Sequence, residues 1–352
     1  MNRRLLILSL GTAVTLACDR GSPTASRLPS LHADAVGAVV VSAITDLGTL
    51  PGGDFSSAAA INAAGVIVGS SNTQPGGPSH AALWQPDGTV RDLGTLPGGE
   101  QSFAVAINAR VQVAGSSSVG GFFPFHAFRW ENGVMTDLGT LPGGGFSSAT
   151  GINNAGDVVG SSGGHPVLWR SDGSLVDLGT LPGSVGGGAT AINDRGQVVG
   201  SSNFPDFVTV HAFLWQAGTM IDLGTLGGDS SIALAINNAG QVVGTSTLPG
   251  PFAPGHAFLW QQGAGMTDLG TLPGGSISGA AGISASGRIV GRGTTATGQE
   301  AFFWQAGTFT GLGTLGGPFS SAMGVNASGQ VVGFSATPSF AFHAVRWTMR
   351  SR

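Results

Sequence analysis

The 352-residue chain contains no lysine, no tyrosine and one cysteine, and charged residues make up only 9% of it. Without lysine, Schiff-base chemistry and phosphate binding by a P-loop lysine are both excluded. The single cysteine, Cys18, excludes an intrachain disulfide. The net charge of −4 provides no basic surface of the kind that binds nucleic acid. The 41% of hydrophobic residues nevertheless indicates a folded chain, because disordered chains are poor in apolar residues and rich in charge.

The N-terminal segment has the pattern of an export signal. Arg3 and Arg4 precede the apolar stretch "LLILSLGTAVTLA", and Cys18 follows it. The sequence "TLAC", which ends at Cys18, resembles the lipobox of bacterial lipoproteins, in which the cysteine is lipidated. We therefore predict a signal peptide over 1–17, then a lipid-anchor cysteine and flexible tether over 18–41. The expected location is the bacterial cell envelope, and a plain signal peptide of an extracellular protein is the alternative.

The rest of the chain is one unit repeated seven times. The octet "DLGTLPGG" first occurs at Asp46 and recurs with small changes every 40 to 46 residues. An "INxxG" turn and one tryptophan accompany each copy, and these account for all seven tryptophans. The first unit shows four short β-branched or small apolar segments, "SSAAAIN", "VIVGSS", "HAALW" and "TVRDLGTL", separated by turn residues. No segment combines helical spacing with helix caps, so an all-β fold is expected.

Four-stranded units of this length, repeated four to eight times, are typical of a β-propeller. The repeats open with a lone fourth strand over 43–50 and close with a third strand, "HAVRWTM". The first strand can therefore complete the last blade and remove the open sheet edges. We predict a seven-bladed propeller over 42–352, and an open β-solenoid is the alternative. In this propeller "SSAAAIN" is innermost, and the "PGG" crossings share one face with the variable loops between strands two and three.

Three linked motifs resemble the HAF repeat family, bacterial extracellular repeats named for His-Ala-Phe. The motifs are "INNAGQVVG", "HAFLW" and "MTDLGTL", and the resemblance covers about 43–349. It departs locally, since Ala-Ala follows His80, Pro-Val follows His165, and Glu300 replaces a histidine. The resemblance implies export and a repeat architecture. It implies no established reaction, and therefore supplies no catalytic residue.

The repeated polar residues are predicted to be structural. Equivalent residues of different blades lie around a ring, too far apart to converge on one metal ion. Each histidine needs a hydrogen-bond partner, for which the octet aspartate and a serine of "VVGSS" are the candidates. The tryptophans are expected in the core. Two motif matches, G-x-S-x-G over 160–164 and a P-loop glycine spacing over 48–53, lack the helix that each requires. We predict no metal, no cofactor and no catalytic residue.

Function is expected where the repeats differ, in the variable loops between strands two and three. These loops hold eight phenylalanines that form the candidate binding set: Phe122, Phe123, Phe125, Phe204, Phe207, Phe252, Phe340 and Phe342. Their rings either form an exposed contact surface or fold back over the blades. The expected partner is an envelope or extracellular protein or another apolar ligand. Sugar is disfavoured because no tyrosine and no spare tryptophan is present for stacking, and membrane contact is expected through the anchor only.

Three functional hypotheses remain open. The first, which we favour, is a non-catalytic, monomeric binding or scaffold module that uses the variable-loop face. The second is a hydrolase or lyase with a site at the channel mouth, since propellers host many reactions. Arg292 and Glu300, which flank one hairpin loop of the sixth blade and could pair across it, are its first candidates. The third is a purely structural surface protein without a specific ligand.

Overall fold

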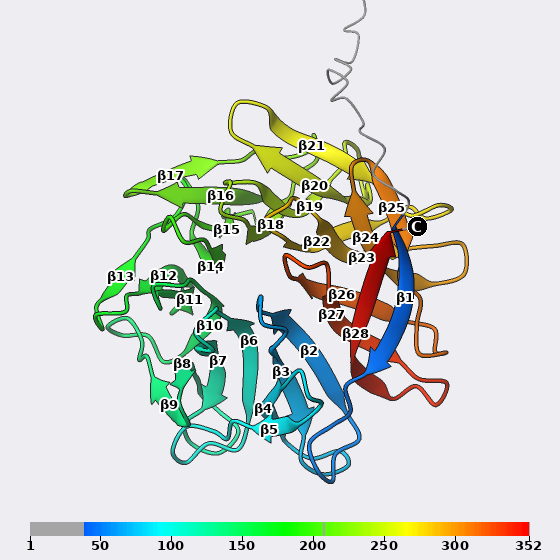
Figure 1. Cartoon of the computed structure of the whole chain (residues 1–352). Coiled ribbons are helices and arrows are strands. Elements are labelled where there is room, and N and C mark those ends of the chain that lie inside the picture. Colours follow the sequence, from blue (N-terminus) through cyan, green and yellow to red (C-terminus); the bar gives the residue numbers. More distant parts are fainter. Residues whose placement is uncertain (1–38, 207, 352) are drawn as a thin grey trace, which may run out of the picture. The chain divides into compact units, whose positions relative to one another are not determined.

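The computed structural model describes residues 39–206 and 208–351 and consists of seven sheets, each of four antiparallel strands. The sheets stand around a common axis as the blades of a propeller (Figure 1). The predicted seven-bladed fold is thereby confirmed. The described residues include no helix long and apolar enough to cross a membrane. The predicted signal peptide, Cys18 and most of the tether lie outside the described residues.

Each of the first six blades uses four consecutive strands, and the first strands of neighbouring blades contact one another around the ring. Blades one to three are β2 (Ser56–Ile61), β3 (Ile67–Asn72), β4 (Ser79–Trp84), β5 (Val90–Asp92); β6 (Ser102–Ile107), β7 (Val113–Ser118), β8 (Phe125–Glu131), β9 (Val134–Asp137); β10 (Ser147–Ile152), β11 (Val158–Ser162), β12 (His165–Trp169), β13 (Leu175–Asp177). Blades four to six are β14 (Gly186–Ile192), β15 (Val198–Asn203), β16 (Val210–Gln216), β17 (Thr219–Asp222); β18 (Ser231–Ile236), β19 (Val242–Thr247), β20 (Gly255–Gln261), β21 (Gly265–Gly270); β22 (Ser278–Ile283), β23 (Ile289–Thr294), β24 (Gln299–Gln305), β25 (Thr308–Gly311).

The seventh blade joins the two ends of the domain. It contains β26 (Ser320–Val325), β27 (Val331–Ala336), β28 (Phe342–Ser351) and β1 (Val39–Asp46), and β1 pairs antiparallel with β28. The lone first strand therefore closes the ring, as the broken repeats predicted. It begins at Val39, so the last three residues assigned to the tether belong to the propeller. Val39, Val41 and Ile44 pack against the cluster that contains Trp347, which explains the earlier start.

The core lies between adjacent blades. Val68 and Leu83 of the first blade, for example, pack with Phe128 and Trp130 of the second. Five of the seven tryptophans are buried as predicted, and Trp215 and Trp304 are half-buried. Small residues on the inner strands let the blades approach closely near the axis, where little room remains between neighbouring sheets.

The octet forms the crossing from one blade to the next. In its first copy, Asp46 Oδ1 accepts the Gly48 N–H at 2.9 Å and ends β1, so the strand stops four residues earlier than predicted. The Gly48 carbonyl accepts the Ser56 hydroxyl at 2.8 Å, and the Leu50 N–H donates to Ser71 Oγ at 2.8 Å. Ser56 Oγ also accepts the Ala344 N–H of the preceding blade at 2.9 Å. Because partners within the protein use these groups, the octet fastens blades together rather than cradling a phosphate.

Candidate functional site

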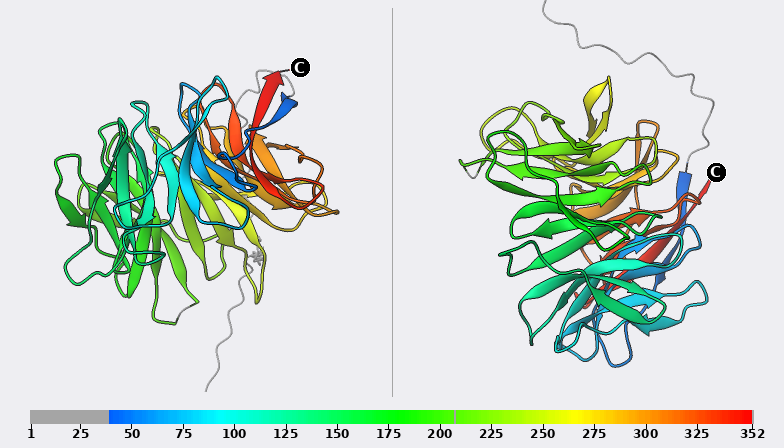
Figure 2. Two further views of the ribbon diagram at one scale, coloured as in Figure 1. Left: turned by 90° about the horizontal axis from the view of Figure 1, so that it is seen from below. Right: turned by 90° about the vertical axis from the view of Figure 1, so that its left-hand side faces the viewer.

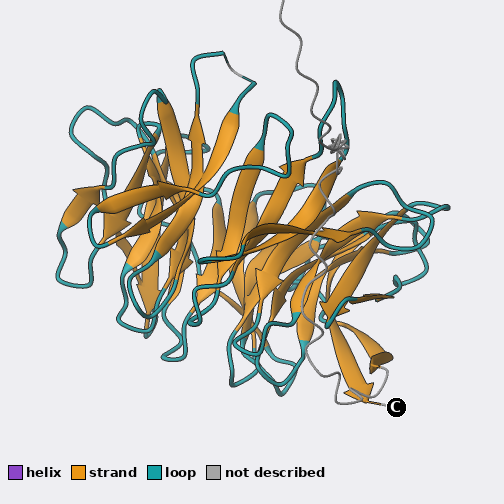
Figure 3. Cartoon of the chain, turned by 90° about the horizontal axis from the view of Figure 1, so that it is seen from above, coloured by secondary structure: helices purple, strands orange, loops and turns teal. Residues whose placement is uncertain are grey.

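The variable loops and the octet crossings lie on the same face of the disc, as the sequence predicted. Short parallel bridges join them in three blades, between Gly99 and Gly121, Val210 and Ser230, and Gln299 and Phe319. We call this side the loop face, and the opposite side, which carries the tight turns within the blades, the turn face. Side views show loops projecting from both faces (Figures 2 and 3).

Four of the eight predicted phenylalanines are exposed on the loop face. Phe252 is fully exposed at 106%, Phe123 is exposed to 75%, Phe340 to 66% and Phe122 to 48%. Two of them, Phe252 and Phe340, have φ values of 59° and 65°, a region that is costly for a bulky side chain.

Three predicted phenylalanines are half-buried, so the expectation of inward-folded rings also holds in part. The centroid of the Phe125 ring lies 5.5 Å from that of Phe123, an edge contact, and the Phe204 ring lies 5.4 Å from that of His211. The Phe342 ring packs edge-on against Phe334 at 5.7 Å. These three rings therefore pack against neighbouring aromatic side chains rather than projecting fully into solvent. The eighth, Phe207, lies outside the described residues.

The sequence reasoning missed a second group of exposed apolar residues on the loop face. Four of them follow the glycine-rich crossings, and one lies in the variable loop of the fourth blade. They are Phe146, Val185, Ile277, Phe319 and Val208. The available signal was the apolar residue that follows the "PGG" segment in several repeats. Together with the four exposed phenylalanines they form the apolar set of the loop face, of a kind that often marks a contact surface.

The loops and crossings of this face carry carboxylates, and their sequences contain no arginine. Asp54, Glu100 and Asp229 follow octet crossings, and Asp206 lies in a variable loop. Hydrogen bonds from the Thr209 hydroxyl and from the N–H groups of Thr209 and Val208 lower the pKa of Asp206 below its ordinary value. The loops therefore combine exposed apolar side chains with negative charge, which disfavours an anionic partner.

The repeated histidines are paired with the octet aspartates, which confirms one of the two predicted partners. The Nδ1-to-carboxylate distances are 2.8 Å for His80–Asp92, His126–Asp137 and His211–Asp222, 3.2 Å for His165–Asp177, 2.9 Å for His256–Asp268 and 2.7 Å for His343–Asp46. The hydrogen bond with Asp92 raises the pKa of His80, although partial burial opposes the shift. Each pair ties a third strand to the fourth beside it.

The sixth blade replaces this pair by a different contact. Glu300, at the histidine position, accepts the Gly313 N–H at 2.7 Å, the bond that the octet aspartate makes elsewhere. A side chain at Gly311 would collide with the Glu300 carboxylate, so the two substitutions compensate each other. Glu300 makes no ion pair with Arg292, which is exposed on β23. The suggested pairing across the hairpin loop was therefore wrong, because the carboxylate is used to cap the crossing.

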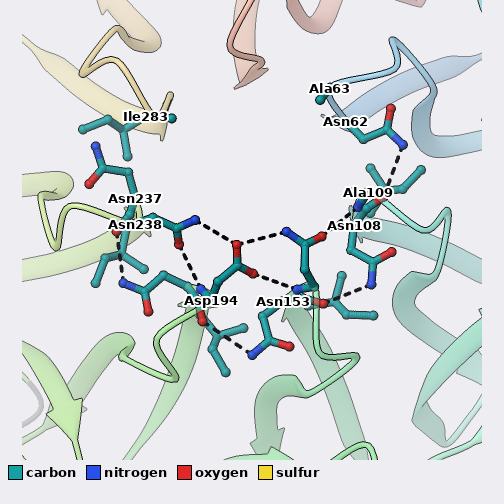
Figure 4. Close-up of a pocket in the computed structure, with 16 residues that line it drawn as sticks. Asn62, Ala63, Asn108, Ala109, Asn153, Asp194, Asn237, Asn238 and Ile283 are labelled. Carbon is teal, nitrogen blue, oxygen red and sulfur yellow. Dashed lines mark hydrogen bonds between the residues drawn. The ribbon is translucent and has the colours of Figure 1, made fainter.

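The turn face is organised around the mouth of the central channel, a cavity of about 250 Å³ (Figure 4). The buried asparagine of each "INxxG" turn donates from Nδ2 to the carbonyl of the equivalent residue in the next blade. These bonds run from Asn62 to Asn108, Asn108 to Asn153, Asn153 to Asn193, Asn193 to Asn237, Asn237 to Ser284 and Asn326 to Asn62, at 3.0–3.5 Å. We call this set the asparagine ring. The sequence signal was the recurrent asparagine, which we had interpreted only as a turn residue.

The asparagine ring is interrupted once, in the sixth blade, where Ser284 cannot reach the next carbonyl. Arg288 spans that seam instead, since its Nη1 donates to the Ala327 carbonyl at 3.2 Å. The serine hydroxyl accepts the Arg288 N–H at 3.1 Å and so preserves the turn.

One ionisable side chain, Asp194, lies among the residues that line this cavity. It accepts hydrogen bonds from Asn154 N at 2.8 Å, Asn154 Nδ2 at 3.0 Å and Asn238 Nδ2 at 2.8 Å (Figure 4). Partial burial acts to raise the pKa of Asp194, but these hydrogen bonds outweigh it and lower the pKa. The polar side chains at the channel mouth therefore bond to backbone and side-chain groups of neighbouring blades and hold the blades together.

No protein-family model and no curated protein sequence matches the chain. Solved structures with similar folds include the β-propeller domain of the Trilobed protease from Pyrococcus furiosus (TM-score 0.53, 8% identity, covering 86% of this chain and 96% of that one). A streptogramin B lyase (0.53, 10%, 88% and 98%) and the Dos1 propeller (0.51, 11%, 84% and 82%) are also similar. At such identities the likeness shows the propeller fold alone. The protease domain is described as having an open velcro topology, whereas β1 closes the ring here.

Proposed function

We propose that this chain is an exported HAF-type repeat protein that acts as a binding or scaffold module and contacts its partner through the loop face. The observation that carries the proposal is the apolar set of that face, nine exposed side chains on a domain with little charge. Monomeric proteins rarely expose large apolar patches without a partner. A protein or other apolar partner fits this surface, because neither tyrosine nor an exposed tryptophan is available to stack on sugar rings.

The first described strand runs toward the loop face. Val39 pairs with Ser351, and β1 runs from that pair toward the crossing at Asp46 on the loop face. Val39 therefore lies at the end of β1 that is farther from the loop face.

The binding role is tested with a triple variant, Phe122→Ser, Phe123→Ser and Phe252→Ser, in the full chain. Crosslinking to detergent-solubilised envelope proteins of the source organism should give a discrete adduct with the unaltered chain, reduced at least ten-fold in the variant. The control variant, Val134→Ser and Ile221→Ser, alters exposed apolar residues of the outer strands β9 and β17. Equal adduct yields from the triple variant and the unaltered chain, at equal thermal stability, would reject the loop-face role.

The proposed anchor is tested separately. The Cys18→Ser variant should move from the membrane fraction to the soluble fraction of the exporting cell and lose incorporation of labelled fatty acid. Two acyl chains or more give stable membrane attachment, whereas one alone does not. A variant that keeps both its membrane association and its label would show that Cys18 is not the anchor.

A further inference from the structure

A cavity of the loop face lies between the first and last blades. Its volume is about 370 Å³, within the range of small-ligand sites. Phe55, Phe340 and Phe342 supply apolar walls, and Asp54, Asn72 and Ser79 supply polar groups. The two blades that meet here are consecutive only through closure of the ring, so residues from opposite ends of the domain form one site.

The carboxylate of Asp54 is held in place from behind. Asn72, which is only 4% exposed, donates from Nδ2 to Asp54 Oδ1 at 2.6 Å, and its Oδ1 accepts the N–H groups of Asp54 and Phe55 at 3.0 and 2.9 Å. The side chain of Asp54 itself is exposed. Its second oxygen, Oδ2, therefore remains available to a ligand while the first is fixed by a buried amide.

This arrangement differs from the equivalent position of other blades. In the second, fifth and sixth blades Ser118, Thr247 and Thr294 end the second strand, and their short hydroxyls accept only backbone N–H groups of the crossing. Within the described part of the chain, the pairing of a buried amide with a crossing carboxylate occurs at Asn72 and Asp54 alone. Phe340 lies opposite, in a left-handed backbone conformation that a phenylalanine adopts only at a cost.

Charge indicates the class of ligand. The loops of this face carry carboxylates and no arginine, and no lysine exists in the chain. An anionic membrane, a nucleic acid or an acidic peptide would meet repulsion here, whereas a basic group would be attracted. The aromatic walls add apolar contact and a π-face for a cation.

We propose that this cavity, lined by Asp54, Phe55, Asn72, Phe340 and Phe342, binds a segment of a partner polypeptide in which an apolar side chain adjoins a basic residue. The apolar side chain packs against Phe340 and Phe342, and the cationic group pairs with Asp54 Oδ2. The inference rests on the proposed binding role of the loop face and specifies the chemistry of its partner.

The test uses three peptide amides of equal length as probes: acetyl-Phe-Arg-amide, acetyl-Phe-Gln-amide and acetyl-Phe-Glu-amide. Titration of the full chain, followed by the chemical shifts of the peptide protons, should rank their affinities Arg, Gln, Glu in decreasing order. An exposed ion pair contributes at most about 1 kcal/mol, so the arginine peptide should bind up to about five-fold more tightly than the glutamine peptide. Equal affinities for all three peptides would overturn the proposal.

Two variants assign the effect to the cavity. Asp54→Asn preserves the acceptor for Asn72 and should lower the affinity for the arginine peptide to that for the glutamine peptide. Phe340→Ser should weaken binding of both. The matched controls, Asp229→Asn at another crossing and Ile221→Ser on the outer strand β17, should change neither. An arginine preference that survives Asp54→Asn would overturn the assignment.

The outcomes separate this inference from the proposed function. If the Phe122, Phe123 and Phe252 triple variant loses its envelope adduct while Asp54→Asn affects neither peptide nor adduct, the cavity inference fails alone. If the peptides bind as expected and the triple variant keeps its adduct, the wider loop-face role fails and the cavity remains.

Discussion

The two faces of the propeller are built from the same repeats but carry different kinds of side chain. On the turn face, six asparagines and one arginine join neighbouring blades through hydrogen bonds around the channel mouth. On the loop face, exposed phenylalanines stand on loops that differ from blade to blade, and two of them occupy strained backbone conformations. Polar groups of the first face satisfy one another, whereas nine apolar side chains of the second face are exposed. Both faces therefore join neighbouring blades, through the asparagine ring on one side and the octet crossings on the other, and exposed apolar loops belong to the loop face, where we propose recognition.

Deleting β1, residues 39–46, should have the largest effect, because it removes the strand that closes the ring. Val39, Val41 and Ile44 would leave the core, and β28 would become an unpaired edge. We expect the free energy of unfolding to fall by at least about 3 kcal/mol, based on partial burial of three aliphatic side chains. Urea denaturation measures this. A deletion of eight residues before β1 is the control, and an equal midpoint for both deletions would contradict the closure role.

On the turn face, Asn108→Ala should cost about 2–3 kcal/mol, because one substitution leaves several buried groups unpaired. Asn108 donates to the Asn153 carbonyl at 3.0 Å and accepts the N–H groups of Arg110 and Gln112. Thermal unfolding followed by circular dichroism reports the loss.

The reverse change, Ser284→Asn, tests the asparagine ring by completing it. It would supply the missing Nδ2 at the one seam that lacks it and should raise stability by about 0.5–1.5 kcal/mol. A decrease in stability would show that the hydrogen bonds of Arg288 and Ser284 stabilise that junction between blades better than an asparagine does.

The His80–Asp92 pair should make a smaller, pH-dependent contribution. The pKa of His80 is raised, so its contribution is fully present below the ordinary value of 6.5 and is lost as pH rises through the folded-state value. Burial acts to raise the pKa of Asp92, but hydrogen bonds from His80 and Gly94 lower it, so its contribution is lost as pH falls through that value. Relative to the unaltered chain, His80→Ala should lose most stability between about pH 4 and 6.5, by less than about 1 kcal/mol. Urea midpoints across pH measure this, and a difference that grows above pH 8 would contradict it.

On the loop face, Phe340→Gly should leave the free energy of unfolding unchanged or raise it by up to about 1 kcal/mol. Glycine accepts φ values near 65° without steric cost, and the ring that it removes is mostly exposed. The same variant should weaken binding of the arginine peptide. Loss of more than 1 kcal/mol in a denaturation experiment would show that Phe340 serves stability rather than recognition.

The sequence predicted on which side of the propeller the loop phenylalanines lie, because the order of strands within a repeat determines where each loop is. The phase of the repeats placed Phe122, Phe252 and Phe340 together on one face. Sequence could not tell that Phe125 and Phe342 turn inward, because ring orientation depends on neighbours such as Phe123 and Phe334. The asparagine ring was also missed, because its bonds join residues about 45 positions apart in different blades.

Glu300 is a second case in which the sequence was not sufficient to predict a contact. Its replacement of histidine was visible in the sequence, and so was the glycine that replaces the octet aspartate eleven positions later. Pairing with the nearby Arg292 was suggested because both flank one hairpin loop. Only the register of β24 and β25, which sets Glu300 against the crossing, shows that the carboxylate replaces the missing aspartate.

The sequence alone determined the seven-bladed ring and its closure by the first strand, and it limited the histidine partners to aspartate or serine, because a repeat places the same local chemistry in every blade. Tertiary structure decided which phenylalanines are exposed, how the asparagines join the blades, and that Asp54 and Phe340 share a cavity. Those outcomes depend on contacts between blades, and Asp54 and Phe340 meet only because the ring closes and brings the first and last blades together.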